Sequence, residues 1–161
     1  MEYIIRTMRE DEYPLLREFL YEAIFQEAVD SPLSKTIINQ PEISQYIRYF
    51  GTQKDDDCLC AEINEKVIGA VWVRCMEGYG TIDKHVPEMA IALFETYRGQ
   101  GIGTCLIRHM LKRLKGKGYA RVSLSVQRKN PAWHLYHRIG FDIISEQDEE
   151  YIMAYDFKEN S

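Results

Sequence analysis

Residues 98–104 read Arg-Gly-Gln-Gly-Ile-Gly-Thr, so that three alternate glycines follow one arginine. This run lies between an apolar segment, residues 89–94, and a helical pattern that begins near Ile102. Glycines allow several backbone N–H groups to point at one anion, and the first turn of the following helix adds unpaired N–H donors. The run therefore predicts a pyrophosphate-binding loop, to which Arg98 would add a planar, bidentate cation.

Two common nucleotide-binding motifs do not fit this loop, because the third glycine position of the dinucleotide fingerprint is missing and no Gly-Lys-Ser or Gly-Lys-Thr follows. The run does match R/Q-x-x-G-x-G/A, with Arg98, Gly101 and Gly103 in the defining places. On this match the chain resembles the GNAT superfamily of acyl-CoA-dependent N-acyltransferases. Residues 130–141 resemble a second motif of that family, N-P-A-x-x-L-Y-x-x-x-G-F, at the expected distance downstream.

The resemblance carries specific motifs over residues 65–145 and implies an activity. It implies an N-acetyltransferase that takes the acetyl group from acetyl-CoA as cosubstrate and passes it to a primary amine by direct transfer in a ternary complex. The alternative is a catalytically silent sensor or regulatory module that binds acyl-CoA. The acceptor would be an amine-bearing small molecule or peptide, and the sequence does not name it.

Amide formation from a thioester requires a neutral amine, and deprotonating a lysine-type amine of pKa about 10.4 costs roughly 4 kcal/mol at neutral pH. Glu88 is the best candidate for the base, because it is the lone acid at the head of the apolar strand that precedes the glycine run. Partial burial there would raise its pKa toward a useful range. A structural ion pair is the other interpretation of Glu88, and His85 or a water relay could serve as the base instead.

Tyr136 occupies the tyrosine position of the second motif, on a helix that GNAT members pack beside the thioester sulfur. Its phenol could protonate the departing thiolate, since its reference pKa, near 10, lies above that of a simple thiol, about 8.5. The alternative is a packed aromatic ring with a satisfied hydroxyl. The resemblance further implies that a backbone N–H near Leu93 polarises the thioester carbonyl, where two strands splay apart.

Asn130 matches the family's cofactor-contacting asparagine, although a helix N-cap explains it equally well. The residues predicted to bind the cofactor are Leu93, Phe94, Arg98, Gly99, Gln100, Gly101, Ile102, Gly103, Thr104 and Asn130. No metal site is expected, because His134 and His137 lack a third ligand at suitable spacing. Trp72 and Arg74 share one face of a strand, and we expect a packed tryptophan beside a surface arginine.

The order of hydrophobic patterns predicts an α/β (α+β) fold with a mixed, mostly antiparallel central sheet flanked by helices, which is also the GNAT arrangement. Helices are expected at residues 11–29, 42–50, 102–116 and 131–139, the last opened by Pro131. Strands are expected at residues 3–8, 58–63, 67–75, 88–95, 121–126, 141–145 and 151–157. The second and third of these strands would form a hairpin around residues 64–66.

Composition bounds the remaining possibilities. The 161 residues suit one domain, residues 1–161, and a net charge of −5 disfavours binding to nucleic acid. No apolar run approaches the roughly 20 residues that cross a bilayer, and the amino terminus lacks a secretory pattern, so a cytoplasmic protein is expected. The four cysteines have no C-x-x-C pair, which favours buried free thiols. An exposed strand edge could support a homodimer.

Overall fold

Seven strands form one mixed sheet in the computed structural model, which describes residues 2–26 and 31–159. The strands are β1 Ile4–Thr7, β2 Asp57–Ile63, β3 Lys66–Arg74, β4 Glu88–Leu93, β5 Arg121–Gln127, β6 Asp142–Glu146 and β7 Glu150–Asp156. Their order across the sheet is β1-β2-β3-β4-β5-β7-β6, and every neighbouring pair is antiparallel except β4 and β5. The predicted mixed, mostly antiparallel α/β sheet is therefore confirmed.

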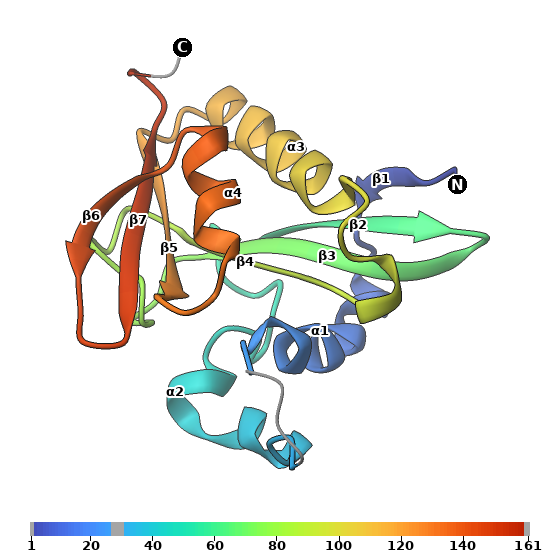
Figure 1. The fold of residues 1–161 in the computed structure, drawn as a ribbon. Coiled ribbons are helices and arrows are strands. Elements are labelled where there is room, and N and C mark those ends of the chain that lie inside the picture. The colour runs from blue at the N-terminus through green and yellow to red at the C-terminus, as the bar shows by residue number, and fades with distance from the viewer. Residues whose placement is uncertain (1, 27–30, 160–161) are drawn as a thin grey trace.

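Helices cover both faces of the sheet, with α3 and α4 on one face and α1 and α2 on the other (Figure 1). The α-helices are α1 Leu16–Ala23, α2 Pro41–Ser44, α3 Ile102–Gly116 and α4 Ala132–Ile139, and three short 3-10 helices are η1 Glu10–Leu15, η2 Lys35–Asn39 and η3 Glu95–Tyr97. Among the described residues, no helix is both long and apolar enough to cross a bilayer.

Two hydrophobic clusters hold these layers together. On one face, Ile102, Leu106, Ile107, Met110, Leu111 and Leu114 of α3 are all buried against the sheet. On the other face, Phe19 and Leu20 of α1 pack with Trp72 and Ala92 of the sheet. The helical period predicted for α3 is confirmed, because its apolar stripe at i, i+4, i+5 and i+8 faces the sheet along the whole helix.

Several predicted boundaries were wrong in detail. The first helix begins as η1 and its α-helical part ends at Ala23, since Ile24 is already extended, with φ −76° and ψ 114°; residues 27–29 of the predicted helix lie outside the described residues. The predicted helix 42–50 shortens to α2 followed by turns. Strand β4 ends at Leu93, two residues early, because η3 begins after Phe94. Helix α4 begins at Ala132 rather than Pro131.

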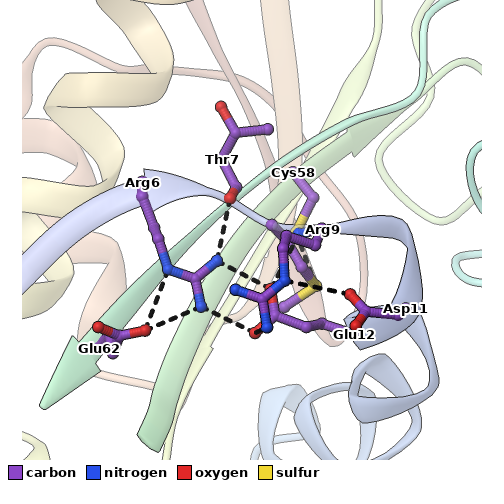
Figure 2. Close-up of polar contacts among 8 residues, drawn as sticks. Arg6, Thr7, Arg9, Asp11, Glu12, Cys58 and Glu62 are labelled. Atoms are coloured by element: carbon purple, nitrogen blue, oxygen red, sulfur yellow. Dashed lines mark hydrogen bonds and ion pairs between the residues drawn. The ribbon is translucent and has the colours of Figure 1, made fainter. Parts of the chain in front are cut away.

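The edge of the sheet is tied to the start of α1 by an ion-pair network around Arg6 (Figure 2). The guanidinium of Arg6 donates to both carboxylate oxygens of Glu12, at 2.8 Å each, and to Glu62 on β2 at 3.1 and 3.0 Å. The Arg6 guanidinium lowers the pKa of Glu12 to about 2. The backbone N–H of Arg9 also donates to Glu12, at 2.9 Å. These bonds orient η1, and through it α1, relative to β1 and β2.

A second polar anchor fixes the far end of α3. Asp57, a buried residue of β2, accepts hydrogen bonds from Arg113 at 2.5 Å and from Lys117 at 2.7 Å. The basic helix end therefore binds a specific carboxylate, in addition to its favourable position at the negative end of the helix dipole. All four cysteines are free thiols, and Cys58 and Cys60 are buried in β2 as predicted, whereas Cys75 and Cys105 are only partly buried.

Candidate active site

A cavity of about 730 Å³ opens where β4 and β5 separate. In the described part of the chain these two strands pair at one position, Glu88 with Ser123, next to a hydrogen bond from the Ser123 N–H to the Pro87 carbonyl at 3.0 Å. Beyond that point the strands diverge. The cavity is lined by residues 89–91 of β4, residues 124–127 of β5, parts of α1 and α2, Asn130 and Tyr136, Tyr79, and the turn 147–150.

Glu88 lines this cavity and is only 2% exposed. Burial raises the pKa of its carboxyl to about 7, although hydrogen bonds from Tyr46, Thr81 and the Gly80 backbone oppose the rise. The carboxyl can therefore exchange a proton near neutral pH. The predicted burial of Glu88 is confirmed, whereas His85 is exposed and lies outside the residues that line the cavity.

Tyr46 is a site residue that the sequence analysis missed. It lies just after α2, 42 residues from Glu88, and its hydroxyl donates a hydrogen bond to Glu88 Oε2. The loop between β3 and β4 closes over the same carboxyl, since a Cβ placed on Gly78 would lie 2.5 Å from Glu88 Oε1 and 2.7 Å from the Tyr46 hydroxyl. No spacing links Tyr46 to Glu88, but the glycines at positions 78 and 80 are a signal that a backbone approaches the site closely.

Tyr136 projects from α4 into the same cavity as Glu88. Burial raises the pKa of its phenol to about 12, so the hydroxyl stays protonated and available as a donor at neutral pH. Asn130 also lines the cavity, and its Oδ1 accepts a hydrogen bond from the Ala132 N–H at 3.0 Å. The N-cap of α4 is Pro131, so Asn130 makes this bond to the first helical residue from one position before the N-cap.

The glycine loop has the backbone that an anion site requires. Gly99 and Gly101 adopt left-handed conformations, with φ of +76° and +85°, and no atom lies within 4 Å of a Cβ placed on either residue. The first helical hydrogen bond of α3 runs from the Cys105 N–H to the Gly101 carbonyl, so the N–H groups of residues 102–104 precede the helical pattern of bonds. These donors and the open space around the glycines fit a pyrophosphate group.

The comparison with known proteins agrees with this geometry. The sequence model of the Acetyltransferase (GNAT) family matches residues 17–141 of the chain, well over half of its length. The chain belongs to the GNAT family. The matched segment extends from the start of α1 to the residue before β6, so it includes β4, the glycine loop, α3 and Tyr136.

The curated relatives that the chain matches are acetyltransferases of different kinds. Mycothiol acetyltransferase from Corynebacterium glutamicum (strain R) is 32% identical over 95 residues, which cover 56% of this chain and 30% of the relative. N-alpha-acetyltransferase 30 from Schizosaccharomyces pombe is 31% identical over 105 residues, covering 65% and 69% of the two chains. The chain therefore spans about a third of the mycothiol enzyme and about two thirds of the yeast enzyme.

The fold of the chain matches those of solved acetyltransferase structures over almost its whole length. The PaiA N-acetyltransferase from Thermoplasma acidophilum, solved in complex with coenzyme A, superimposes with a TM-score of 0.71 at 20% identity, over 98% of this chain and 100% of that chain. The ribosomal-protein-S18-alanine N-acetyltransferase from Escherichia coli gives a TM-score of 0.66 at 18% identity, over 96% and 94% of the two chains. At these identities the likeness concerns the fold.

Strand β4 of this GNAT protein turns alternate backbone groups toward the gap. The Phe94 N–H donates to the Ile68 carbonyl of β3 at 3.0 Å. Because backbone groups alternate in an antiparallel ladder, the N–H and C=O groups of residues 88, 90 and 92 also point toward β3. The N–H of Leu93 therefore points toward the β5 side, as the predicted carbonyl-polarising role requires. Phe94 differs, because its N–H is occupied by β3 and its ring packs on Phe19 of α1 with centroids 4.8 Å apart.

Arg98 does not present its guanidinium to the glycine loop. Its Nε donates to the Leu93 carbonyl at 3.0 Å, and its Nη2 pairs with the Glu22 carboxylate of α1 at 2.9 Å. The Gln100 side chain likewise bonds within the loop, to the Thr96 carbonyl at 3.3 Å. In this structure the anion donors of the GNAT loop are therefore backbone groups, while Arg98 links the end of β4 to α1.

The prediction that Arg74 lies at the surface was wrong, because its side chain is buried. Only 1% of Arg74 is exposed, and its guanidinium forms two hydrogen bonds of 2.9 Å with Asp56. It also donates to the carbonyls of Gln45 and Arg48, at 2.8 and 2.6 Å. Both carbonyls belong to the segment that follows α2, so Arg74 holds this segment against the sheet. Trp72 is packed as predicted, and its Nε1 donates to the Tyr46 carbonyl at 3.1 Å.

The wall opposite α1 is acidic. The turn between β6 and β7 brings Asp148, Glu149 and Glu150 to the cavity, in addition to Glu88. Among the described residues that line the cavity, none is lysine, arginine or histidine. Arg128 holds the turn from outside the cavity, because its Nε donates to the Gln147 carbonyl at 2.7 Å. The acidic residues of the cavity wall would therefore attract a positively charged ligand.

Proposed function

We propose that this GNAT protein is an acetyl-CoA-dependent N-acetyltransferase that transfers the acetyl group directly to an amine in a ternary complex. The observation that supports this most strongly is the shared cavity of Glu88 and Tyr136. The carboxyl of Glu88 has a pKa of about 7 and suits a general base, whereas the phenol of Tyr136 has a pKa of about 12 and suits a general acid.

Acetyl-CoA supplies the acyl group as a thioester, and the chain has residues that fit its parts. The backbone N–H groups of residues 99–104 would hold the pyrophosphate. The edge of β4 that faces away from β3 would accept the pantetheine arm, with the Leu93 N–H available to the thioester carbonyl. Asn130 and Tyr136 of the second motif lie across the gap, on the cavity wall.

The proton transfers follow from the two pKa values. Glu88, ionised, accepts a proton from the acceptor's ammonium group, directly or through a water, so that the neutral nitrogen can form the new C–N bond. Tyr136 donates its phenolic proton to sulfur as the C–S bond breaks, and the phenolate regains a proton from the nitrogen, which must lose a second proton once the C–N bond has formed. Glu88 then releases its proton to solvent. The cysteines give no covalent alternative, since Cys58 and Cys60 are buried and no cysteine lines the cavity among the described residues.

The acceptor is proposed to be a positively charged amine, on a small molecule or a peptide. Its charge would be attracted by the acidic turn 148–150, which faces the cavity on the β7 side. The apolar residues of α1, among them Leu20 and Ile24, would contact the uncharged part of the same molecule. The expected compartment and a homodimer remain predictions from the sequence.

The test is acetyl-CoA-dependent release of thiol across a panel of polyamines, amino acids, aminoglycosides and peptides, beside calorimetric titration of acetyl-CoA. Glu88→Gln and Tyr136→Phe should each lower kcat by about 10²-fold or more, with acetyl-CoA affinity nearly unchanged. Tyr155→Phe is the matched control for Tyr136→Phe, because both rings pack on Phe141, at 5.5 and 6.2 Å, and only Tyr136 lines the cavity.

Three outcomes separate the hypotheses. Turnover that both variants lose, and that Tyr155→Phe keeps, would support the proposal and identify the acceptor. Unchanged rates in both Glu88→Gln and Tyr136→Phe would contradict the assignment of base and acid. Tight binding of acetyl-CoA without turnover for every amine would favour the sensor module.

A further inference from the structure

The carboxyl of Glu88 is held by two hydroxyl groups that reach it from different segments. The Tyr46 hydroxyl, from the segment after α2, donates to Glu88 Oε2. It also accepts a hydrogen bond from the Tyr79 N–H at 3.0 Å. Since a hydroxyl has one proton to donate, this arrangement leaves the Tyr46 proton on the side of Glu88. Tyr46 is itself fixed, because it is 7% exposed and Trp72 binds its carbonyl.

Thr81 contacts the other oxygen in a different way. Its Oγ1 accepts from the Gly78 N–H at 2.8 Å, lies 2.8 Å from the Met76 carbonyl and lies 3.2 Å from Glu88 Oε1. When Glu88 is protonated on Oε1, it can donate to Thr81, whose own proton stays on the Met76 carbonyl. When Glu88 is ionised, the Thr81 hydroxyl can turn its proton to Oε1 instead. Thr81 thus has a role in both protonation states.

We propose that Tyr46 is a positioning residue for the base, which fixes Glu88 Oε2 and favours the ionised carboxylate, so that Oε1, beside Thr81, is the oxygen that gains and loses the proton. This inference rests on the proposed function of Glu88. Tyr46 acts through Glu88, and because it belongs to the segment that Arg74 and Trp72 anchor, it connects the base to the α2 side of the cavity.

The other polar groups around Glu88 do not take the place of Tyr46. Arg74, the cross-strand partner of Glu88 on β3, has its guanidinium engaged by Asp56. Glu150 on β7 acts in the opposite direction, because its negative charge disfavours ionisation of Glu88. Ser123 on β5 pairs with Glu88 through the backbone register. The remaining donor is the Gly80 N–H, and a Cβ on Gly80 would lie 3.1 Å from the Glu88 carboxyl carbon, so the loop is in close contact.

The experiment measures the titration of Glu88 itself. Protein labelled with ¹³C at glutamate carboxyls would be titrated by NMR, with Glu88→Gln used to assign the resonance. Tyr46→Phe should raise the pKa of Glu88 by about 1 pH unit, since a hydrogen bond to a charged group is lost. The acid limb of the kcat/KM profile should move to higher pH by the same amount. Tyr119→Phe is the matched control, because its hydroxyl also donates to a carboxylate, that of Asp55, outside the cavity.

Thr81→Val provides a second variant of nearly unchanged shape. Because Thr81 partners Glu88 in both protonation states, its loss should raise the pKa of Glu88 less than Tyr46→Phe does. An unchanged Glu88 pKa in folded Tyr46→Phe would overturn the proposal, and so would a larger rise in Thr81→Val than in Tyr46→Phe. Should Tyr46→Phe not fold, a rise of the Glu88 pKa by a full pH unit or more in Thr81→Val would contradict the proposal, because Thr81 would then be the main partner of the ionised carboxylate.

The titration is read without substrate, so it separates this inference from the proposed function. A wild-type protein that acetylates no amine would contradict the acetyltransferase proposal, and with it the catalytic meaning of the Tyr46 contact. Turnover that depends on Glu88, together with a Glu88 pKa that does not respond to Tyr46→Phe, would preserve the acetyltransferase and refute the positioning role.

Discussion

Replacing Glu88 with glutamine should make the protein more stable at alkaline pH while it lowers turnover. Burial raises the pKa of Glu88 from an ordinary 4.5 to about 7 in the folded chain. Between these two pH values the folded state binds more protons than the unfolded state, so the free energy of unfolding falls as pH rises. Each pH unit in this interval lowers the free energy of unfolding by roughly 1.4 kcal/mol, so the total loss above pH 7 is about 3 kcal/mol.

The glutamine side chain avoids this loss, because it is neutral at every pH and fits the same partners. Its amide oxygen can accept from Tyr46, and its NH₂ group can donate to the Thr81 hydroxyl, as a protonated Glu88 would. The stability difference between Glu88→Gln and wild type should therefore grow in favour of the variant by about 2 kcal/mol between pH 5.5 and pH 8. That corresponds to a shift of roughly 4–8 °C in the difference between the two melting temperatures.

Urea unfolding of both proteins at several pH values measures this directly. All other ionisable groups titrate in both proteins, so the difference between the two curves isolates Glu88. A difference that is the same at pH 5.5 and pH 8 would refute the reasoning, because Glu88 would then have the same pKa in the folded and unfolded chain.

Further substitutions test other contacts by chemical unfolding at neutral pH. Asp56→Asn should lower the free energy of unfolding by about 3–5 kcal/mol, because it leaves the buried guanidinium of Arg74 without its counter-charge; a loss below 1 kcal/mol would mean that the backbone carbonyls suffice. Gly69→Ala should cost about 1–3 kcal/mol, since its Cβ would lie 2.1 Å from Leu93 Cδ2. Gly116→Ala at the end of α3 has nothing within 4 Å and should instead stabilise by about 0.5–1 kcal/mol, so equal effects of the two alanines would contradict the packing argument.

Local patterns predicted the parts of the fold that depend on local chemistry. The hairpin at Asn64 and Glu65 is an example, because both residues adopt positive φ, 51° and 65°, as a tight two-residue turn requires. The α3 stripe is another, since six apolar residues at helical spacing leave one face to bury. Glu88 was likewise predicted from its place as the lone acid at the head of the strand before the glycine loop, and Tyr136 from its place in the second motif.

Contacts between distant segments could not be found in this way. The burial of Arg74 depends on Asp56, a residue at the end of a polar turn 18 positions earlier, and three adjacent aspartates give no indication which one will pair. The contact of Tyr46 with Glu88 depends on how Arg74 and Trp72 pull the segment after α2 against the sheet. The alternation of side chains along β3 correctly predicted that Trp72 and Arg74 share one face of the sheet, but it does not predict which segment covers that face.

The site follows from the parallel pairing of β4 and β5 within an otherwise antiparallel sheet. Strand β4 is bonded to β3 along its whole length, from Glu88 to Leu93, whereas its other edge meets β5 at Glu88 alone. The base therefore lies where both edges of β4 are paired, which is the most restrained point of the strand. The open edge of β4 ends at Leu93, immediately before the segment that leads to the glycine loop. A parallel pair needs a long crossover, and here α3 supplies it, so the same connection that opens the gap also brings the anion-binding helix terminus to its end.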